Sequence, residues 1–254
     1  MVFFVRKNVV PQIREAAKSM GFASSFMALG DMVINSGLQN QAVPCYDGFT
    51  MHRRAGMELL TRDFFDRDTV QVARELLGKQ LVRVLEDGTE LVCSITETEA
   101  YVGPVDKACH AYGYKRTPRT QTLFAPPGTA CIYLIYGMYH CLNFVTEAEG
   151  EPCAVLIRGA KPVKNEDIIA EYRFGRKTNE LNAYQRKNFL NGPGKLCKGL
   201  SLTRAQNGLD LLTTVGGLYV CDGPAPVHIH AGKRIGIDYA EEAVDFPWRF
   251  WSET

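Results

Sequence analysis

The sequence lacks the patterns that mark several large classes of protein. No run of apolar residues approaches the roughly 20 that a membrane-spanning helix requires, so we expect no membrane segment. The eight cysteines form no C-x-x-C pair and follow no secretory signal, which disfavours both a disulfide framework and a zinc ribbon. Internal repeats and low-complexity tracts are also absent. We therefore expect reduced thiols in an intracellular protein, cytoplasmic in a bacterium or nuclear in a eukaryote.

What remains is an ordinary globular composition, 46% hydrophobic and 22% charged, in a chain of 254 residues. This length suits one domain of about 200 residues with an extension. Residues 1–57 differ from the rest and begin with a faintly basic stretch that weakly resembles a transit peptide. We interpret residues 1–57 as an extension of unknown role, with a dispensable or mis-started extension favoured over organelle targeting and with disorder left open. The globular domain is expected to span residues 58–251.

Local patterns predict mixed α/β secondary structure in this domain. Asp66 or Asp68 is placed to cap a helix that ends at Gly78. The strands that follow are separated by a tight Asp-Gly turn, and residues 131–144 predict a second hairpin. Residues 165–190 are expected to be helical and residues 217–220 to form a further strand.

Charge is unevenly distributed along the chain although the net charge is only +1. Residues 101–198 contain 14 basic and 8 acidic residues, and within them residues 158–198 contain 10 basic and 4 acidic ones. A basic half on a nearly neutral chain can supply a binding face for an anionic ligand. The alternative is that these residues are solvated faces of one or two helices.

The predicted strand ELVCSITETEAY, residues 90–101, carries two carboxylates, Glu97 and Glu99, after its apolar residues. Strict alternation would place Glu97 and Glu99 on the same face as Cys93 and Ile95. If that face is buried, at least one glutamate lies beside a desolvated cavity and is a candidate general acid or base. The alternative is that the strand ends near Thr96 and both side chains lie in solvent.

Residues 131–144, CIYLIYGMYHCLNF, place three tyrosines around a predicted turn. A buried strand favours bulky apolar residues, whereas Tyr133, Tyr136 and Tyr139 each carry a hydroxyl that needs a partner or water. Taken alone, the stretch favours tyrosines packed in the core. The Gly137-Met138 pair is expected to permit the turn.

The loop DKACHAYGYKRTPRT combines a histidine with a basic, polar run. His110 alone favours a structural hydrogen bond over a metal site. The H-x-E and P-C-x-x-C patterns of zinc deaminases do not occur, so no metal is expected. Arg116, Thr117 and Arg119 are suited to contacts with phosphate groups.

Four blocks of sequence now point to one family. They are TETEAYVGPVDKACHAYGYKRTPRT, PPGTACIYLIYGMYHCLNF, AVLIRGAKP and NGPGKLCKGL. With these blocks in family order over about residues 58–250, the chain resembles the alkyladenine (3-methyladenine) DNA glycosylases, monofunctional enzymes that excise alkylated purines. The resemblance implies a single α+β domain with a curved, mainly antiparallel sheet, flanking helices and a protruding β-hairpin. Its architecture would be similar to the C-terminal domain of formyl-transferases.

The resemblance also implies roles for individual residues. Glu99 matches the carboxylate that activates a water for attack on C1′ of a flipped nucleotide, and Arg158 matches an arginine that holds this carboxylate ionised. Tyr136 matches a wedge that enters the minor groove and occupies the gap left in the duplex. The matching base pocket consists of Tyr101 on one face of the base, His110 and Tyr133 on the other, and Asn143, Leu156 and the backbone of Ile235 around it. Met138 and Tyr139 match residues beside the wedge.

Function and partners follow from the same resemblance. The expected activity is hydrolysis of the N-glycosidic bond of alkylated or deaminated purines in double-stranded DNA, by a monomer without metal, nucleotide cofactor or lysine Schiff base. 3-Methyladenine and 7-methylguanine are the expected lesions, and the preference among these, hypoxanthine and ethenoadenine stays open. Two other classes also stay open. One is a paralogue that binds damaged DNA without cleaving it, and the other is a hydrolase of free nucleosides.

Overall fold

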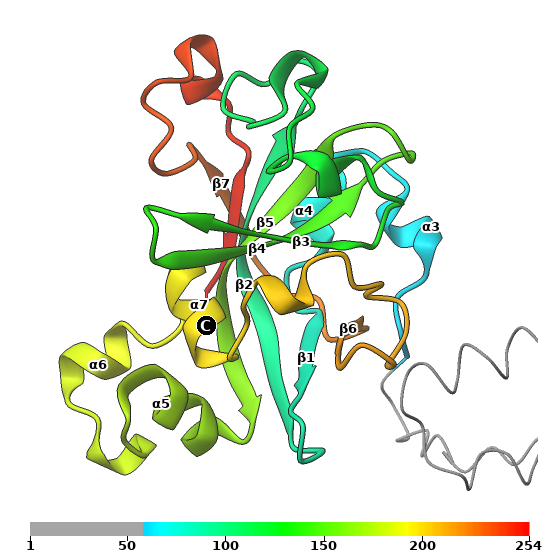
Figure 1. Ribbon diagram of the computed structural model, residues 1–254. Coiled ribbons are helices and arrows are strands. Elements are labelled where there is room, and N and C mark those ends of the chain that lie inside the picture. Colours follow the sequence, from blue (N-terminus) through cyan, green and yellow to red (C-terminus); the bar gives the residue numbers. More distant parts are fainter. Residues whose placement is uncertain (1–57, 254) are drawn as a thin grey trace, which may run out of the picture. The chain divides into compact units, whose positions relative to one another are not determined.

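The computed structural model describes residues 58–253, and the predictions for residues 1–57 lie outside this range. Eight strands form one sheet within it, and all pairings between them are antiparallel (Figure 1). The prediction of a mixed α/β domain with a mainly antiparallel sheet is confirmed. The strands are β1 (Gln80–Val84), β2 (Glu90–Val102), β3 (Ala130–Ile135), β4 (Tyr139–Thr146), β5 (Cys153–Lys164), β6 (Leu218–Cys221), β7 (Ile229–Gly232) and β8 (Arg249–Ser252).

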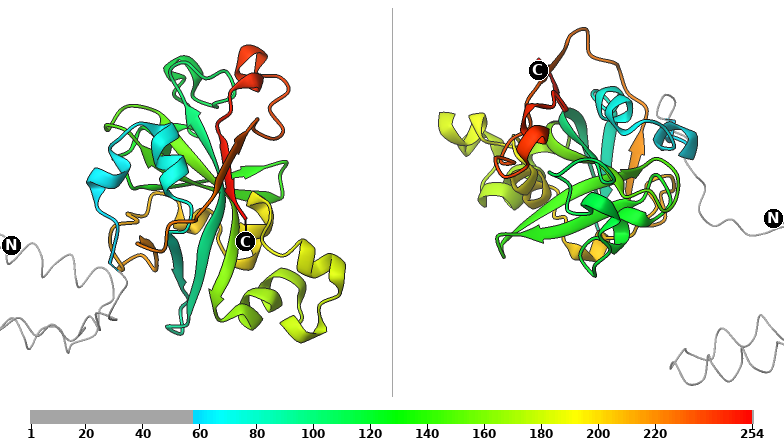
Figure 2. Two further views of the ribbon diagram at one scale, coloured as in Figure 1. Left: turned by 180° about the vertical axis from the view of Figure 1, so that it is seen from behind. Right: turned by 90° about the horizontal axis from the view of Figure 1, so that it is seen from above.

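Short helices flank the sheet, and α5 and α6 extend away from α3 and α4 (Figures 1 and 2). The α-helices are α3 (Arg62–Phe65), α4 (Thr69–Glu75), α5 (Glu166–Phe174), α6 (Ala183–Lys187) and α7 (Pro193–Gly199). Five 3-10 helices lie at Tyr112–Tyr114, Gln121–Phe124, Thr178–Glu180, Arg204–Gln206 and Glu241–Asp245. No helix among residues 58–253 is long and apolar enough to cross a membrane.

Strand β2 is central to the sheet, whose order is β3-β4-β5-β2-β1-β6. It pairs with β5 along one edge, and along the other edge with β1 and then with β8. The main core lies between this sheet and the helices α4 and α7, and it includes Phe65, Leu76, Ile157 and Leu196. The long central strand thus connects the core with the edge at which β7 and β8 lie.

Several local predictions are confirmed. Asp68 caps α4 by accepting the N–H of Gln71 at 2.8 Å, and Gly78 takes a left-handed φ of 87° soon after the helix ends. The turn at Asp87 and Gly88 joins β1 to β2, and β6 covers most of residues 217–220. Local propensities and tertiary packing therefore agree in these segments.

The predicted helix over residues 165–190 is wrong in its length. Helix α5 ends at Phe174, because Gly175 takes a left-handed φ of 70° that stops the helix. After a short 3-10 turn, Asn182 caps the separate helix α6 by accepting the N–H of Gln185. Residues 165–190 therefore contain separate short helices instead of one long helix.

Two bulges beside Glu97, in addition to a register shift at Val92 and Cys93, interrupt the pairing of β2 with β5. The first leaves Thr96 of β2 without an opposite residue, and the second leaves Arg158 of β5 without one. The alternating pattern of β2 consequently changes phase, so the row of core residues that includes Ile95 resumes at Ala100. The predicted sharing of one face by Ile95 and Glu99 is therefore wrong, and Glu99 projects from the side opposite to the main core.

The β3–β4 hairpin turns at Tyr136 and Gly137, and its tip extends beyond the neighbouring strands (Figure 1). Met138 N–H donates to the carbonyl of Ile135 at 3.1 Å across these two residues, which have φ values of 51° and 70°. The prediction of a turn at Gly137 and Met138 is confirmed, and Tyr136 belongs to the same turn. The side chain of Tyr136 is 84% exposed, which excludes the core position that the stretch alone favours and agrees with the exposed position that the family resemblance implies. A bulky residue in the left-handed region is a strained position.

This strain predicts an unusual order of stabilities. Replacing Tyr136 with Gly removes the steric conflict, whereas replacing it with Ala keeps the Cβ that causes it. Because the ring is exposed in wild type, both variants lose little burial. We expect Tyr136→Gly to exceed Tyr136→Ala by about 0.5–1 kcal/mol in the free energy of unfolding, measured in urea. The reverse order, which is usual at other backbone positions, would contradict the strained turn.

Candidate active site

Glu99 is a carboxylate enclosed within the protein, with its side chain 0% exposed. Its Oε2 accepts the hydroxyl of Tyr101, two residues along β2, at 2.8 Å. Its Oε1 accepts the backbone N–H of Ile235 at 2.8 Å. One donor thus comes from the same strand and the other from a loop far along the chain, so tertiary structure fixes the orientation of the carboxylate.

The bulge on β5 brings Arg158 to this carboxylate. Its Nη1 lies 3.4 Å from Oε2 of Glu99, and its Nε lies 3.0 Å from Oε1 of Glu97. Arg249, on β8, places its own Nε 3.6 Å from the same oxygen of Glu97. Two arginines and two glutamates therefore form a charge network in which Arg158 is shared between the carboxylates.

Burial and the surrounding donors act on the pKa of Glu99 in opposite directions. Desolvation is the largest effect and raises the pKa, while Arg158, the N–H of Ile235 and the Tyr101 hydroxyl lower it, and the nearby charge of Glu97 raises it. The net result is a pKa above the ordinary value. Arg158 thus reduces the rise in pKa that burial causes, whereas the sequence predicted that Arg158 would offset this rise completely.

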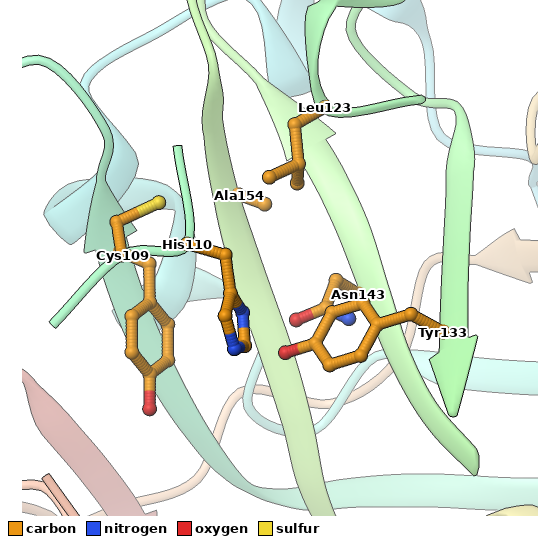
Figure 3. A pocket seen from close by; sticks show the side chains of 7 residues that line it. Cys109, His110, Leu123, Tyr133, Asn143 and Ala154 are labelled. Carbon is orange, nitrogen blue, oxygen red and sulfur yellow. The ribbon is translucent and has the colours of Figure 1, made fainter. Parts of the chain in front are cut away.

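A pocket opens beside Tyr101, the residue whose hydroxyl bonds to Glu99, and Figure 3 shows side chains that line this pocket. The rings of His110 and Tyr133 meet there edge to face, with centroids 5.1 Å apart and planes at 79°. Tyr101 also lines the pocket, so its hydroxyl connects the pocket wall to the carboxylate. The complete lining consists of Tyr101, Cys109, His110, Leu123, Tyr133, Asn143 and Ala154. Four residues predicted to hold a base are brought together here.

Asn143 is a buried member of this lining. Its Nδ2 donates to the carbonyls of Cys131 and Cys141, at 3.1 and 3.4 Å. Figure 3 shows its carbonyl oxygen on the side of His110. With its amide group held by two backbone carbonyls, Asn143 forms a rigid part of the pocket wall.

The loop that carries His110 places positive charge beside the pocket. The guanidinium of Arg119 lies over the Tyr133 ring, 5.2 Å from its centroid, and that of Arg116 lies over Phe124 at 4.1 Å. Thr117 donates its N–H to Oγ1 of Thr120 at 2.8 Å, which closes the loop. His110 is exposed as a residue, yet desolvation of its ring and the charge of Arg119 lower its pKa, so the imidazole is neutral at pH 7.

The remaining predicted residues lie around this centre at different distances from it. Leu156 is buried and lies opposite both Glu99 and Asn143 in the strand pairings, although it does not line the pocket. Met138 is exposed beside Tyr136 at the hairpin tip. Tyr139 is about half exposed, and its ring lies so close to Gly194 of α7 that a Cβ there would come within 3.1 Å of it. Tyr139 thus braces the hairpin against α7.

Two residues at the site had no role in the sequence interpretation. Asp106 and Arg234 form an ion pair whose side chains are both inaccessible, and Arg234 precedes Ile235 in the chain. A charged residue next to an apolar one in a loop gives no sequence signal for burial. Glu97 was noted only with Glu99, and its contact with Arg158 depends on the bulge.

The sequence of this chain is similar to those of known proteins of one family. Residues 63–254 match the family model described as methylpurine-DNA glycosylase. A protein of Clostridium perfringens named "Putative 3-methyladenine DNA glycosylase" is 50% identical over 195 residues, which are 76% of this chain and 94% of that protein. Proteins of the same name from Methanocella arvoryzae and Desulfitobacterium hafniense are 50% and 48% identical over 198 residues, which are 78% of this chain and 94% and 96% of theirs.

The chain belongs to the methylpurine-DNA glycosylase family, and the resemblance seen in its motifs is confirmed. Its class is that of a DNA glycosylase, a hydrolase of N-glycosyl bonds, as the motifs predicted.

The raised pKa of Glu99 predicts how stability changes with pH. A carboxyl whose pKa is higher in the folded protein contributes fully to stability below the unfolded value, near 4.5, and this contribution is lost as pH rises through the folded pKa. Glu99→Gln cannot ionise. The free energy of unfolding of this variant, relative to wild type, should therefore increase as pH rises from 4.5 toward neutrality, measured by urea unfolding.

Asp222 supplies a control of opposite sign. Its hydrogen bond from Lys79 holds the pKa of Asp222 below the ordinary value, so Asp222→Asn should lose stability relative to wild type as pH rises over the acidic range. Equal slopes for the two variants would contradict the assigned burial of Glu99.

Proposed function

We propose that this chain flips alkylated or deaminated purines out of double-stranded DNA and hydrolyses the N-glycosidic bond, leaving an abasic site for base-excision repair. One observation carries the proposal: the Tyr101 hydroxyl in the pocket wall donates to the buried carboxylate of Glu99. A concave aromatic pocket suits a base, and a carboxylate one hydrogen bond away suits the sugar to which that base is attached.

In the proposed reaction, Glu99 in its ionised form takes a proton from the attacking water. Cleavage develops positive charge on the sugar, which the carboxylate also stabilises. Oε2 of Glu99 accepts from both Tyr101 and Arg158, whereas Oε1 accepts the N–H of Ile235 and keeps a further lone pair for the water. Arg158 supports the ionised form, so we assign the catalytic roles to Glu99 and Arg158.

Base recognition is assigned to the pocket. Tyr101 stacks on one face of the flipped base, and His110 and Tyr133 contact the other. Because His110 is neutral at pH 7, it does not repel a cationic base such as 3-methyladenine. The fixed amide of Asn143 crowds the 2-amino position of normal guanine, with Leu156 and the Ile235 backbone close by.

Contacts with the duplex are assigned to the hairpin and the basic loop. The exposed ring of Tyr136 fills the gap left by the flipped nucleotide, with Met138 next to it. Tyr139 holds the hairpin against α7, which makes the wedge rigid. Arg116, Thr117 and Arg119 lie on the pocket side and are suited to phosphates of the flipped strand.

We further propose that residues 58–251 form the catalytic domain, which acts as a monomer inside the cell. A curved sheet like that of formyl-transferase C-terminal domains stays a prediction. The lesions proposed are 3-methyladenine and 7-methylguanine, followed by hypoxanthine and ethenoadenine.

Excision by wild type and Glu99→Gln tests the catalytic assignment. Duplexes that each carry one 3-methyladenine, hypoxanthine or ethenoadenine are incubated with excess protein, and abasic sites are measured in single turnover. Wild type should release at least one of these bases, and Glu99→Gln should be slower by about 10²- to 10⁴-fold because the general base is lost. Asp222→Asn, at an exposed ion pair, is the matched control and should keep the wild-type rate.

Other outcomes would assign another function. Binding of every lesion duplex without release by wild type would indicate a protein that only recognises damage. Release from free nucleosides but not from duplexes would indicate a nucleoside hydrolase. Equal rates for wild type and Glu99→Gln would refute the assigned base.

The wedge is tested by comparing two exposed tyrosines. Tyr136 is 84% exposed at the hairpin tip, and Tyr184 is 74% exposed on α6. Tyr136→Ala should lower the single-turnover excision rate by about 10- to 100-fold, because the stacking that replaces the flipped base is lost. Tyr184→Ala should change it less than 3-fold, and equal losses would contradict a specific wedge.

A further inference from the structure

Arg234 and Asp106 form the most enclosed ion pair among residues 58–253, since neither side chain is accessible to solvent. The guanidinium contacts both carboxylate oxygens, with Nη2 2.8 Å from Oδ1 and Nη1 bonded to Oδ2. This is the forked geometry in which an arginine binds a carboxylate most specifically. Nothing in the proposed reaction uses these two residues directly.

Arg234 joins three separate segments of the chain. It donates to the carbonyl of Ala100 in β2 at 2.8 Å and to the carbonyl of Ala243 at 3.2 Å. Its guanidinium also lies over the rings of Tyr101 and Trp248, 4.7 and 5.1 Å from their centroids. The arginine thus supports Tyr101 from the side of the protein interior.

Asp106 organises the segment that leads from β2 to the pocket histidine. Its Oδ1 accepts the N–H of Ala108 at 3.0 Å, and its Oδ2 accepts the N–H of Val102 at 3.3 Å. These bonds fix the turn between Tyr101 and His110. The ion pair therefore links the two sequence segments that supply opposite walls of the pocket.

The residue after Arg234 supplies the decisive contact. Ile235 donates its N–H to Oε1 of Glu99 at 2.8 Å, although its side chain is half exposed. The other ion pairs of this loop are Lys107 with Glu241 and Glu242, and Lys233 with Asp245, and their acidic partners are well exposed. Exposed pairs contribute little, so the buried pair is the main anchor of the loop.

We propose that Arg234 and Asp106 are positioning residues that hold the Ile235 N–H and the Tyr101 ring in the geometry from which Glu99 acts. This inference rests on the proposed function and extends it to a pair of residues that contact neither the base nor the sugar. Loss of the anchor would free the Ile235 N–H and the Tyr101 ring from this geometry while leaving the carboxylate and Arg158 in place.

The consequence for titration has a definite sign. The charged or titratable groups around Glu99 are Glu97 and Tyr101 on β2, Arg158 on β5, Cys141 on β4, Arg249 on β8 and Arg234 in the loop. Replacing Arg234 and Asp106 together by neutral residues removes one charge of each sign, so these two changes largely offset each other at Glu99. The lost tether of the Ile235 N–H is not offset and disfavours the carboxylate form, so the pKa of Glu99 should rise further.

The test uses the double variant Arg234→Gln with Asp106→Asn in the full chain. Both charges are removed together, because either single change would leave an unpaired charge in the interior. Single-turnover excision from duplexes with one hypoxanthine or ethenoadenine gives the maximal rate and the protein concentration at half saturation. Titration of the ¹³C-labelled Glu99 carboxyl by NMR, assigned with Glu99→Gln, gives a readout that needs no DNA. Lys107→Met, which breaks only the exposed contacts with Glu241 and Glu242, is the matched control.

We expect the double variant to be slower by about 10- to 100-fold with less than a 3-fold change in half saturation, and its Glu99 to titrate at higher pH. A folded double variant with the wild-type rate and titration would overturn the proposal, and so would equal effects of Lys107→Met. If the double variant does not fold, Arg234→Lys keeps the charge without the fork and should show the same loss of rate, and a wild-type rate would again overturn the proposal. Absence of excision by wild type would refute the proposed function alone, since the NMR titration still decides the positioning role.

Discussion

The burial of one carboxylate imposes the main constraint on this structure. An ionisable group without access to water requires a compensating charge and hydrogen-bond donors, or it becomes neutral. Glu99 receives Arg158 from β5, a hydroxyl from its own strand and an N–H from a distant loop. Because these partners come from three segments, the cost of burying the carboxylate is offset only when all three segments are in place. The ionisation of Glu99 thus depends on tertiary structure.

The two bulges explain how a regular sheet meets this constraint. Without the extra residue at Thr96, alternation would direct Glu99 into the apolar core, where no cation lies. Without the extra residue at Arg158, that side chain would lack its approach to the glutamates. Since each strand gains one residue, the register beyond the bulges is restored, and Ile157 and Ala100 pack in the same core as Ile95. The two bulges therefore direct Glu99 and Arg158 toward each other without changing the register of the rest of the sheet.

Sequence patterns predicted those parts of the fold in which local chemistry and packing agree. The capped helix α4, the Asp-Gly turn and the β3–β4 hairpin each have a signal within a few residues of sequence. The family motifs also named four residues that line one pocket in the structure. The patterns failed where a distant segment decides the outcome. The phase of β2 changes because of its pairing with β5, and the burial of Arg234 depends on Asp106, 128 residues away. Neither event leaves a periodic trace in the sequence, so neither could be predicted from it.

The failures coincide with positions to which we assign functions, and there is a physical reason for it. A site needs groups in states that a regular fold avoids: a charge in the interior, or an exposed ring on a strained backbone. Glu99 and Tyr136 are such groups, and each lies where the prediction from pattern was wrong. Both reduce stability locally, so the surrounding structure must hold them in place. The fixed pairing of β2 with β5 does this for Glu99, and the contact of Tyr139 with α7 does it for the hairpin that carries Tyr136. A departure from sequence pattern that is firmly supported by its neighbours is therefore itself an indication of function.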